Sequence, residues 1–234
     1  FTLPRECPVC RSPTEKDGDI LVRCTGTAVC SAQVTSQISH FCSRDAADID
    51  GLGPARVEEL HRMGMVKNIS DIYRLRSADL LGGSGDTGSY IDGKIESTDE
   101  KQSLRQLKGW GDRSVNNLLA AIDTRRELSF ERFLYGLGIR HIGQGSAKDI
   151  AQAFGEFEVF WHYVKKAAEC RATGSEEEPA SCERLFAISG VGPKLVDSLL
   201  DFASLPSACA VVDDTLSEIK ILPVQSSSKK SNES

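Results

Sequence analysis

Apolar residues recur every three or four positions along most of the chain after residue 44, in runs that short glycine turns interrupt. This spacing is typical of amphipathic helices, which bury one face against their neighbours. A clear run follows residue 192 and contains Leu195, Val196, Leu199 and Leu200. Nearer the amino terminus, the segment DGDILVRC reads as a turn followed by a short strand. The pattern therefore predicts a mainly α-helical protein with short β-strands near its amino terminus.

The glycine turns belong to a repeat that occurs four times. Each copy has a Gly-x-Gly motif, or a His in place of the first glycine, and an apolar helical stripe follows it. The second glycines are 58, 32 and 49 residues apart, and leaving out two acidic segments, 82–103 and 169–183, makes these spacings 36, 32 and 34. Because the acidic segments are chosen by composition, the regular spacing separately supports four tandem helix-hairpin-helix motifs. The turn positions are Gly51 and Gly53, Gly109 and Gly111, His141 and Gly143, and Gly190 and Gly192.

Each turn has the properties of an anion-binding site. The first glycine accepts a positive φ, which a side chain disfavours, and the second leaves the main chain open to close approach. The helix that follows presents unpaired N–H groups and the positive end of its dipole, and phosphate commonly binds there. We therefore predict contacts to the DNA backbone, with little sequence readout. The candidate DNA-binding residues are the turn residues above together with Arg56, Arg113, Arg140, Lys148 and Lys194.

A plainer interpretation is that the turns only connect packed helices, with glycine as a helix C-cap. A single Gly-x-Gly favours that interpretation, whereas four copies in register with basic residues nearby favour binding. Trp110 lies between two of the glycines, where it either inserts beside a sugar or packs against the neighbouring repeat. Trp161 lies in an apolar helical segment and is expected in the core. No catalytic residue is predicted, because neither His61 nor His162 has a partner pattern typical of catalysis.

Four cysteines in the first 30 residues have the spacing of a metal site, with Cys7 and Cys10 followed by Cys24 and Cys30. Four thiolates around a d¹⁰ ion form the closed tetrahedral site that is typical of structural zinc. The second pair is wider than in the simplest zinc ribbon, and two disulfides or free thiols are the alternative. We expect the metal to supply most of the folding free energy of this small finger, because it can bury little apolar surface.

The overall charge does not decide what the chain binds. Its net charge is −6, but segments 82–103 and 169–183 carry −3 and −4, which leaves the remainder at +1. The sequence has no apolar run long enough for a membrane span and no signal segment, and we expect the cysteines to be in a reducing compartment. Because the chain begins with Phe1, we also expect it to be a fragment of a longer protein.

The expected organisation has three parts. Residues 1–44 form the four-cysteine zinc finger and a connecting helix. Residues 45–224 form the helix-hairpin-helix domain, with the acidic segments as surface loops, and residues 225–234 form a flexible tail or linker.

Several strings of residues resemble a known family in their order and spacing. They are CPVC, RCTGTAVCSAQ, HFCSRDAADIDGLG, ERFLYGLGIRHIG and the final GVGPK, and they cover nearly the whole chain apart from the acidic segments and the tail. With them the chain closely resembles the carboxy-terminal part of the NAD-dependent DNA ligases, in which a zinc finger precedes a helix-hairpin-helix domain similar to domain 2 of RuvA. The two acidic segments are departures from the family's pattern.

The resemblance implies that an adenylation domain and an OB-fold domain precede Phe1, and it allows a BRCT domain after Ser234. It implies nicked duplex DNA as the partner, and the joining of 3′-hydroxyl and 5′-phosphate ends in replication and repair. NAD and magnesium would act only through the preceding domains, because the lysine of the family's Lys-x-Asp-Gly motif has no counterpart here. The chain alone is therefore not expected to seal nicks. The implied location is the bacterial cytoplasm, in association with the nucleoid, or an organelle or nucleus for a eukaryotic source.

Two other classes of function stay open. One is a non-enzymatic interaction module, in which the hairpins pack against protein and the finger is a joint. The other is a helix-hairpin-helix DNA glycosylase or lyase, which usually has one such motif, a catalytic lysine or aspartate and sometimes an iron–sulfur cluster. The four repeats and the four-cysteine site near the amino terminus favour the ligase segment over both.

Overall fold

The chain divides into two compact units in a computed structural model that describes residues 4–17, 21–26, 29–81, 88–91, 94–97, 103–174 and 178–224. Unit 1 consists of Phe1–Arg44 and Asp48–Arg126, and unit 2 consists of Asp45–Ala47 and Glu127–Ser234. The cysteine-rich segment and the first two glycine turns thus fall in one unit, whereas the sequence analysis divides them at residue 44.

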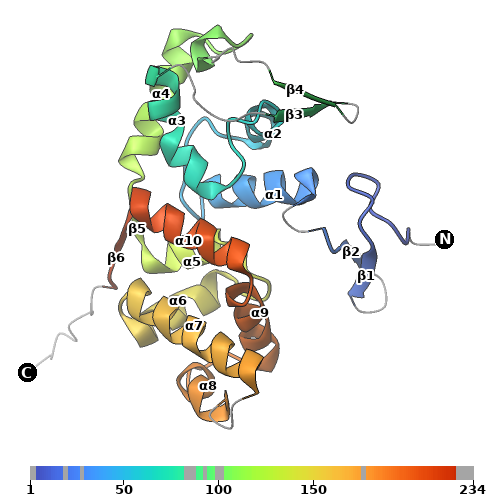
Figure 1. The fold of residues 1–234 in the computed structure, drawn as a ribbon. Coiled ribbons are helices and arrows are strands. Elements are labelled where there is room, and N and C mark those ends of the chain that lie inside the picture. The colour runs from blue at the N-terminus through green and yellow to red at the C-terminus, as the bar shows by residue number, and fades with distance from the viewer. Residues whose placement is uncertain are drawn as a thin grey trace, which may run out of the picture. The chain divides into compact units, whose positions relative to one another are not determined.

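Unit 1 begins with an antiparallel strand pair, of which the second strand is the one that the segment DGDILVRC predicts, and it continues mainly as helices (Figure 1). The strands β1 (Thr14–Asp17) and β2 (Leu21–Cys24) pair with Thr14 opposite Cys24. The helices are α1 (Ser31–Cys42), α2 (Pro54–Arg62), α3 (Ile69–Leu81), the short 3-10 helix η2 (Leu104–Gln106) and α4 (Asp112–Thr124).

The first acidic segment is only partly described, and its described part is not the loop that composition predicts. Two strands, β3 (Gly88–Ile91) and β4 (Lys94–Ser97), pair antiparallel within it. Tyr90 and Ile95 stand opposite each other in this pair, and β-branched and aromatic residues favour strands. Residues 82–87, 92–93 and 98–102 of the segment lie outside the described residues.

The core of unit 1 is formed by the apolar faces of its helices. Phe41 from α1 and Tyr73 from α3 meet edge to face with ring centroids 6.2 Å apart, and both are almost fully buried. Just after α4, Arg126 lies over the Tyr73 ring and donates a 2.6 Å hydrogen bond to its backbone carbonyl. The apolar stripes predicted after the first two turns are also buried, and they comprise Val57, Leu60, Val115, Leu118, Leu119 and Ile122.

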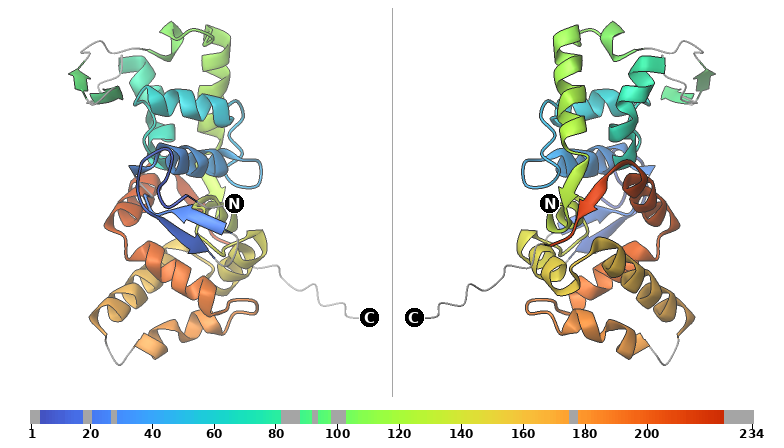
Figure 2. Two further views of the ribbon diagram at one scale, coloured as in Figure 1. Left: turned by 90° about the vertical axis from the view of Figure 1, so that its right-hand side faces the viewer. Right: turned by 90° about the vertical axis from the view of Figure 1, so that its left-hand side faces the viewer.

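Unit 2 begins and ends with strands that pair with each other. The parallel strands β5 (Glu127–Ser129) and β6 (Lys220–Leu222) lie side by side, with the buried Leu128 opposite the buried Ile221 (Figure 2). Between them are α5 (Phe130–Gly136), α6 (Gln144–Phe154), α7 (Phe157–Thr173), α8 (Glu178–Phe186), α9 (Pro193–Ala203) and α10 (Pro206–Glu218).

Aromatic rings fill the centre of unit 2. Phe157 from α7 meets Phe130 and Phe133 from α5 edge to face, with ring centroids 5.3 Å and 4.9 Å apart. Phe154 and Phe160 meet in the same way at 5.2 Å, and Trp161 is buried as the sequence predicts. Such pairs favour one relative orientation of the helices in addition to the apolar area that they bury. The stripes predicted after the third and fourth turns are buried too, and they comprise Ala147, Ile150, Ala151, Leu195, Val196, Leu199 and Leu200.

The prediction that residues 169–183 form a surface loop is wrong for most of them. Helix α7 extends to Thr173, and α8 begins at Glu178. Glutamate, alanine and arginine favour helices, so an acidic composition by itself does not indicate a loop. Arg171 also ties this end of α7 to α9 through a 2.6 Å ion pair with Asp201. Residues 175–177 and the predicted tail, 225–234, lie outside the described residues.

None of the helices in the described ranges is by itself long and apolar enough to cross a membrane. Helices α9 and α10 pass such a test only when taken together, and they are bent by 81° at the break between them.

Trp110 joins the first two repeats within unit 1. Its side chain is 3% exposed, and its Nε1–H donates a 2.9 Å hydrogen bond to Oε2 of Glu59 on α2. The guanidinium of Arg56 lies over its ring, 4.7 Å from the centroid. Of the two roles open to this tryptophan, packing against the neighbouring repeat is therefore the one that the structure has.

Trp110→Ala should lower the free energy of unfolding of unit 1 by about 3–5 kcal/mol, because it leaves a large cavity between the repeats. Trp110→Phe keeps a ring and loses the bond to Glu59, so it should be clearly milder. Denaturant unfolding followed by circular dichroism measures both variants. An alanine variant as stable as the unmodified chain would contradict this packing role.

Candidate metal centre and nucleic-acid interface

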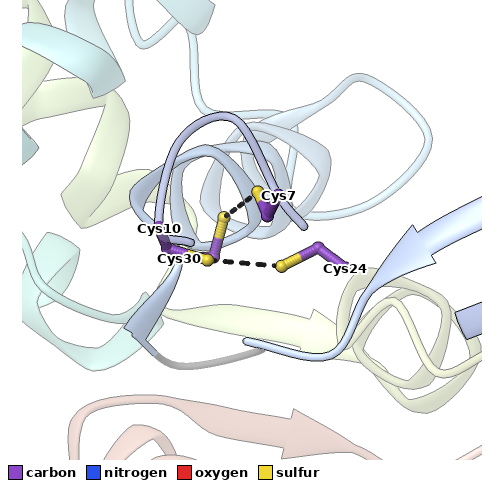
Figure 3. Close-up of side chains that lie close together, drawn as sticks. All are labelled: Cys7, Cys10, Cys24 and Cys30. Atoms are coloured by element: carbon purple, nitrogen blue, oxygen red, sulfur yellow. Dashed lines mark hydrogen bonds between the residues drawn. The ribbon is translucent and has the colours of Figure 1, made fainter. Parts of the chain in front are cut away.

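The four amino-terminal cysteines come together as one cluster (Figure 3). Their sulfur atoms all lie within 4.8 Å of one another, with 3.9 Å between Cys7 and Cys30 and 3.3 Å between Cys10 and Cys24. Four sulfurs bound tetrahedrally to one ion at about 2.3 Å would be about 3.8 Å apart. All four are free thiols and not disulfides. The cluster therefore has the donor set and the spacing to hold one metal ion.

Local backbone structure brings the cysteines to this point. Cys7 and Cys10 lie on a tight turn, in which the N–H of Cys7 donates to Ser12 O and the N–H of Arg11 donates to Cys7 O. Cys24 ends strand β2, and Cys30 is the N-cap residue of α1. The predicted strand therefore sets the third ligand, and the first helix sets the fourth.

Gly26 is a further residue of the site, and sequence reasoning missed it. A Cβ at this position would lie 2.7 Å from Ser12 Oγ and 2.8 Å from Cys10 Sγ, so no side chain fits. Its N–H donates a 3.2 Å hydrogen bond to Cys24 Sγ. The signal in the sequence is a glycine two residues after a cysteine ligand, which lets the backbone wrap closely around the sulfur.

The thiols of the cluster differ in how readily they ionise. Hydrogen bonds from the Ser12 hydroxyl and N–H lower the pKa of Cys10 to about 6. The Gly26 N–H lowers the pKa of Cys24, but burial and the neighbouring sulfurs outweigh it and raise that pKa to about 12. Several negative sulfurs this close together repel one another, and a shared cation would remove that repulsion. Cys42 is not part of the cluster, and burial raises the pKa of its thiol to about 12.

The four glycine turns have the same backbone geometry. Their first positions all have a positive φ, and each second glycine is the N-cap of the helix that follows. The φ values at the first positions are 82° for Gly51, 90° for Gly109, 64° for His141 and 79° for Gly190. His141 has the backbone conformation predicted for the glycine that it replaces, which supports the alignment of the third copy.

The residue between the two turn positions is buried in every copy, a feature that the sequence analysis did not use. These residues are Leu52, Trp110, Ile142 and Val191, and they are 3–7% exposed. An apolar anchor in the core therefore holds each turn in place, while the residues on either side stay at the surface. The signal was available, because an apolar residue stands between the two positions in all four copies.

Each second glycine leaves its turn open. A Cβ at Gly53, Gly111, Gly143 or Gly192 would meet no atom within 4 Å. None of these N-caps has a side chain that caps its helix, and α2, α6 and α9 have no acidic residue in the first turn. At the third turn, the Gly143 N–H donates a 2.9 Å hydrogen bond to Ser146 Oγ within α6. Helices α2 and α9 begin with Pro54 and Pro193, which suit a position where no N–H bond is needed. The helix starts are thus accessible to an external anion.

The candidate basic residues fall into two groups. Arg113, Arg140, Lys148 and Lys194 are exposed, and Arg113 and Lys194 occupy the second position of their helices. A cation at a helix start opposes the dipole, so these two charges do not stabilise the helices themselves. Arg56 differs, because its Nη1–H donates a 3.0 Å hydrogen bond to Gly51 O while its guanidinium stacks on Trp110. Its side chain therefore fixes the first turn against the second.

The first helix of the predicted motif is not equally developed in all copies. Helices α5 and α8 precede the third and fourth turns, and α1 precedes the first. In the described residues just before the second turn, only the 3-10 helix η2 is present. The turn and its following helix are therefore the shared element of the four copies.

Comparison with known proteins gives a consistent result over nearly the whole chain. No model of a protein family matches it. The chain is 34% identical over 225 residues to a protein named DNA ligase from Nitrobacter winogradskyi, and the match covers 96% of this chain. DNA ligases from Zymomonas mobilis and Erythrobacter litoralis are 34% and 36% identical over 96% and 94% of the chain. The chain spans only 29%, 29% and 26% of the length of these three relatives.

The cluster should bind one metal ion per chain, which four thiolates predict to be zinc. Cys24→Ser should reduce the metal content severalfold and destabilise the segment, because it removes one of the four ligands. Cys170→Ser is the matched control, since Cys170 lies on α7 and is not one of the four cluster cysteines. Acidification should release the metal, because the ligands bind as thiolates and protons compete for them.

Elemental analysis and a chromogenic chelator measure the metal content of the two variants. Equal metal content in Cys24→Ser and Cys170→Ser would contradict the assignment of the four ligands.

Proposed function

We propose that this chain, a homologue of a segment of bacterial DNA ligases, is the part of an NAD-dependent ligase that grips DNA. The observation that carries the proposal is the shared geometry of the four turns, in which a buried anchor holds an open helix start at the surface. The homology supports DNA as the partner, because the relatives that match 94–96% of the chain are named DNA ligases.

The turns would act as four helix-hairpin-helix motifs on duplex DNA. At an open helix start, unpaired backbone N–H groups and the dipole favour negative charge, so a phosphate oxygen is the natural occupant. The fourth turn is the best example, because Gly192 leaves the main chain bare and Lys194 adds an exposed positive charge one position into α9. Contacts of this kind position a protein on DNA and carry little sequence information.

The chemistry of sealing would reside in other parts of the parent enzyme. The parent joins a 3′-hydroxyl to a 5′-phosphate at nicks, in replication and repair, and uses NAD and magnesium in its adenylation domain. An OB-fold domain would adjoin that domain, and the family's pattern allows a BRCT domain as a further neighbour in the same chain. This chain has no Lys-x-Asp-Gly motif, which supports placing nucleotidyl transfer outside it. Its action would be in the bacterial cytoplasm, on nucleoid DNA.

The metal would have a structural role in this proposal. Cys7, Cys10, Cys24 and Cys30 would hold one zinc ion, and four protein ligands leave no open position for chemistry. Zinc would fix the shape of the finger, which connects directly to α1 because Cys30 caps that helix. The finger would thereby hold a defined link between the turns and the preceding domains.

Lys194→Ala should weaken binding to nicked duplex DNA roughly tenfold and reduce the slope of log K against log salt by about 1. Lys166→Ala is the matched control, because Lys166 is an exposed lysine on α7 outside the four turns and the change in net charge is the same. Gly192→Val should also weaken binding while the fold is retained, since φ is −105° and a Cβ there meets no atom within 4 Å. Fluorescence anisotropy at several salt concentrations measures all three variants.

Equal affinities of Lys194→Ala and Lys166→Ala would show that only the overall charge matters. Binding unaffected by Gly192→Val would show that the main chain of the fourth turn does not approach DNA. Either result contradicts the proposed grip.

A further inference from the structure

The second turn differs from the other three in the residue that begins its helix. Helix α4 begins with Asp112, whose carboxylate side chain is 80% exposed, whereas α2, α6 and α9 have no acidic residue in the first turn. An anion is therefore already present at the start of α4. Asp112 also favours the helix, because a negative charge complements the positive end of the dipole.

Arg105 holds this carboxylate in place. Its Nη1–H donates a 2.8 Å hydrogen bond to Asp112 Oδ1, and its Nη2–H donates a 2.7 Å hydrogen bond to Asn116 Oδ1, one turn further along α4. A guanidinium that bonds two groups at once is held in one geometry, whereas a single exposed ion pair leaves the side chain free to change conformation. Arg105 comes from η2, so this arrangement also ties the segment before the second turn to the helix after it.

The middle residue of the second turn also makes contacts that the middle residues of the other three turns cannot make. Its middle residue, Trp110, donates to Glu59 and stacks under Arg56, both on the neighbouring α2. The middle residues of the other turns are the aliphatic Leu52, Ile142 and Val191, which have no polar group in the side chain. These contacts of Trp110 with α2 fix the position of the first turn relative to the second.

We propose that the second turn does not bind phosphate, because Asp112 supplies the anion at the start of α4 and Arg105 holds it there. The inference rests on the proposed function and assigns the turns unequal parts in it. A phosphate that approached the N–H groups of Gly111 and Arg113 would meet the like charge of Asp112, and the arginine that could offset that charge is already engaged. The grip on DNA then depends on the other three turns, and the second turn positions the first.

Asp112→Asn should convert the second turn into a phosphate-binding turn. It removes the competing charge, leaves a residue that hydrogen-bonds at a helix start, and releases Arg105 from its ion pair. We expect the affinity for a nicked duplex to rise about threefold to tenfold and the slope of log K against log salt to steepen by about 0.9, as for one added phosphate contact. Asp149→Asn is the matched control. Asp149 is an exposed acid on α6, further along the helix that follows the third turn, and its substitution changes the net charge by the same amount.

A second comparison tests the same point without removing an acid. In the unmodified chain, Arg113→Ala should weaken binding less than twofold, although Arg113 and Lys194 occupy equivalent helix positions. In the Asp112→Asn background, Arg113→Ala should abolish most of the gain. Circular dichroism and metal content establish that each variant is folded, and Asp112→Ser provides a second uncharged variant at the same position.

The outcomes separate this inference from the function on which it rests. If the unmodified chain fails to bind duplex DNA, the proposed function is wrong and the inference falls with it. If the chain binds but Asp112→Asn and Asp112→Ser leave the salt slope as it is, or change affinity no more than Asp149→Asn, the inference alone is wrong. An Arg113→Ala defect as large as that of Lys194→Ala would likewise overturn it.

Discussion

In each of the four turns, an apolar residue buried between the two turn positions holds the candidate interface in shape. Leu52, Trp110, Ile142 and Val191 are drawn into the core, and burying such side chains contributes about 1.5–3 kcal/mol each. With the middle residue held inside, the position before it adopts a positive φ and the position after it becomes the N-cap of a helix. The open helix start is thus a consequence of core packing.

The same packing divides the positive charges of the chain by role. Arg56 and Arg126 hold backbone carbonyls and lie over aromatic rings, so their charges serve the interior of unit 1. Arg113 and Lys194 stand exposed at helix starts, where the dipole gives them no support. A count of basic residues near glycines gives all four the same role, whereas their contacts show that two are structural and two are exposed. At the start of α9, a bound anion would compensate the charge of Lys194.

The sequence could predict the features that depend on local backbone chemistry. Glycine at Gly51, Gly109 and Gly190 indicated a positive φ, and the cysteine spacing indicated a single cluster, because both follow from a few neighbouring residues. The helices themselves were predictable from the apolar stripes.

Features that depend on tertiary contacts were not predictable in this way. The role of Gly26 follows from the approach of Ser12 and Cys10, and the role of Arg56 follows from Trp110, which is far along the chain. Acidic composition predicts a loop at residues 169–173, but α7 accommodates those residues and Arg171 ties them to α9. The boundary between the two units after Arg126 also depends on tertiary contacts, because β5 pairs with β6, which lies near the carboxy-terminal end of unit 2.

At the open turns, DNA phosphate should bind to the main chain. NMR of the amide signals, as a nicked duplex is added to the zinc-loaded chain, measures this contact. Downfield shifts and slowed hydrogen exchange are expected for the N–H groups of Gly192 and Lys194, at the start of α9. Tight binding of the duplex with these two amides unchanged would contradict this contact.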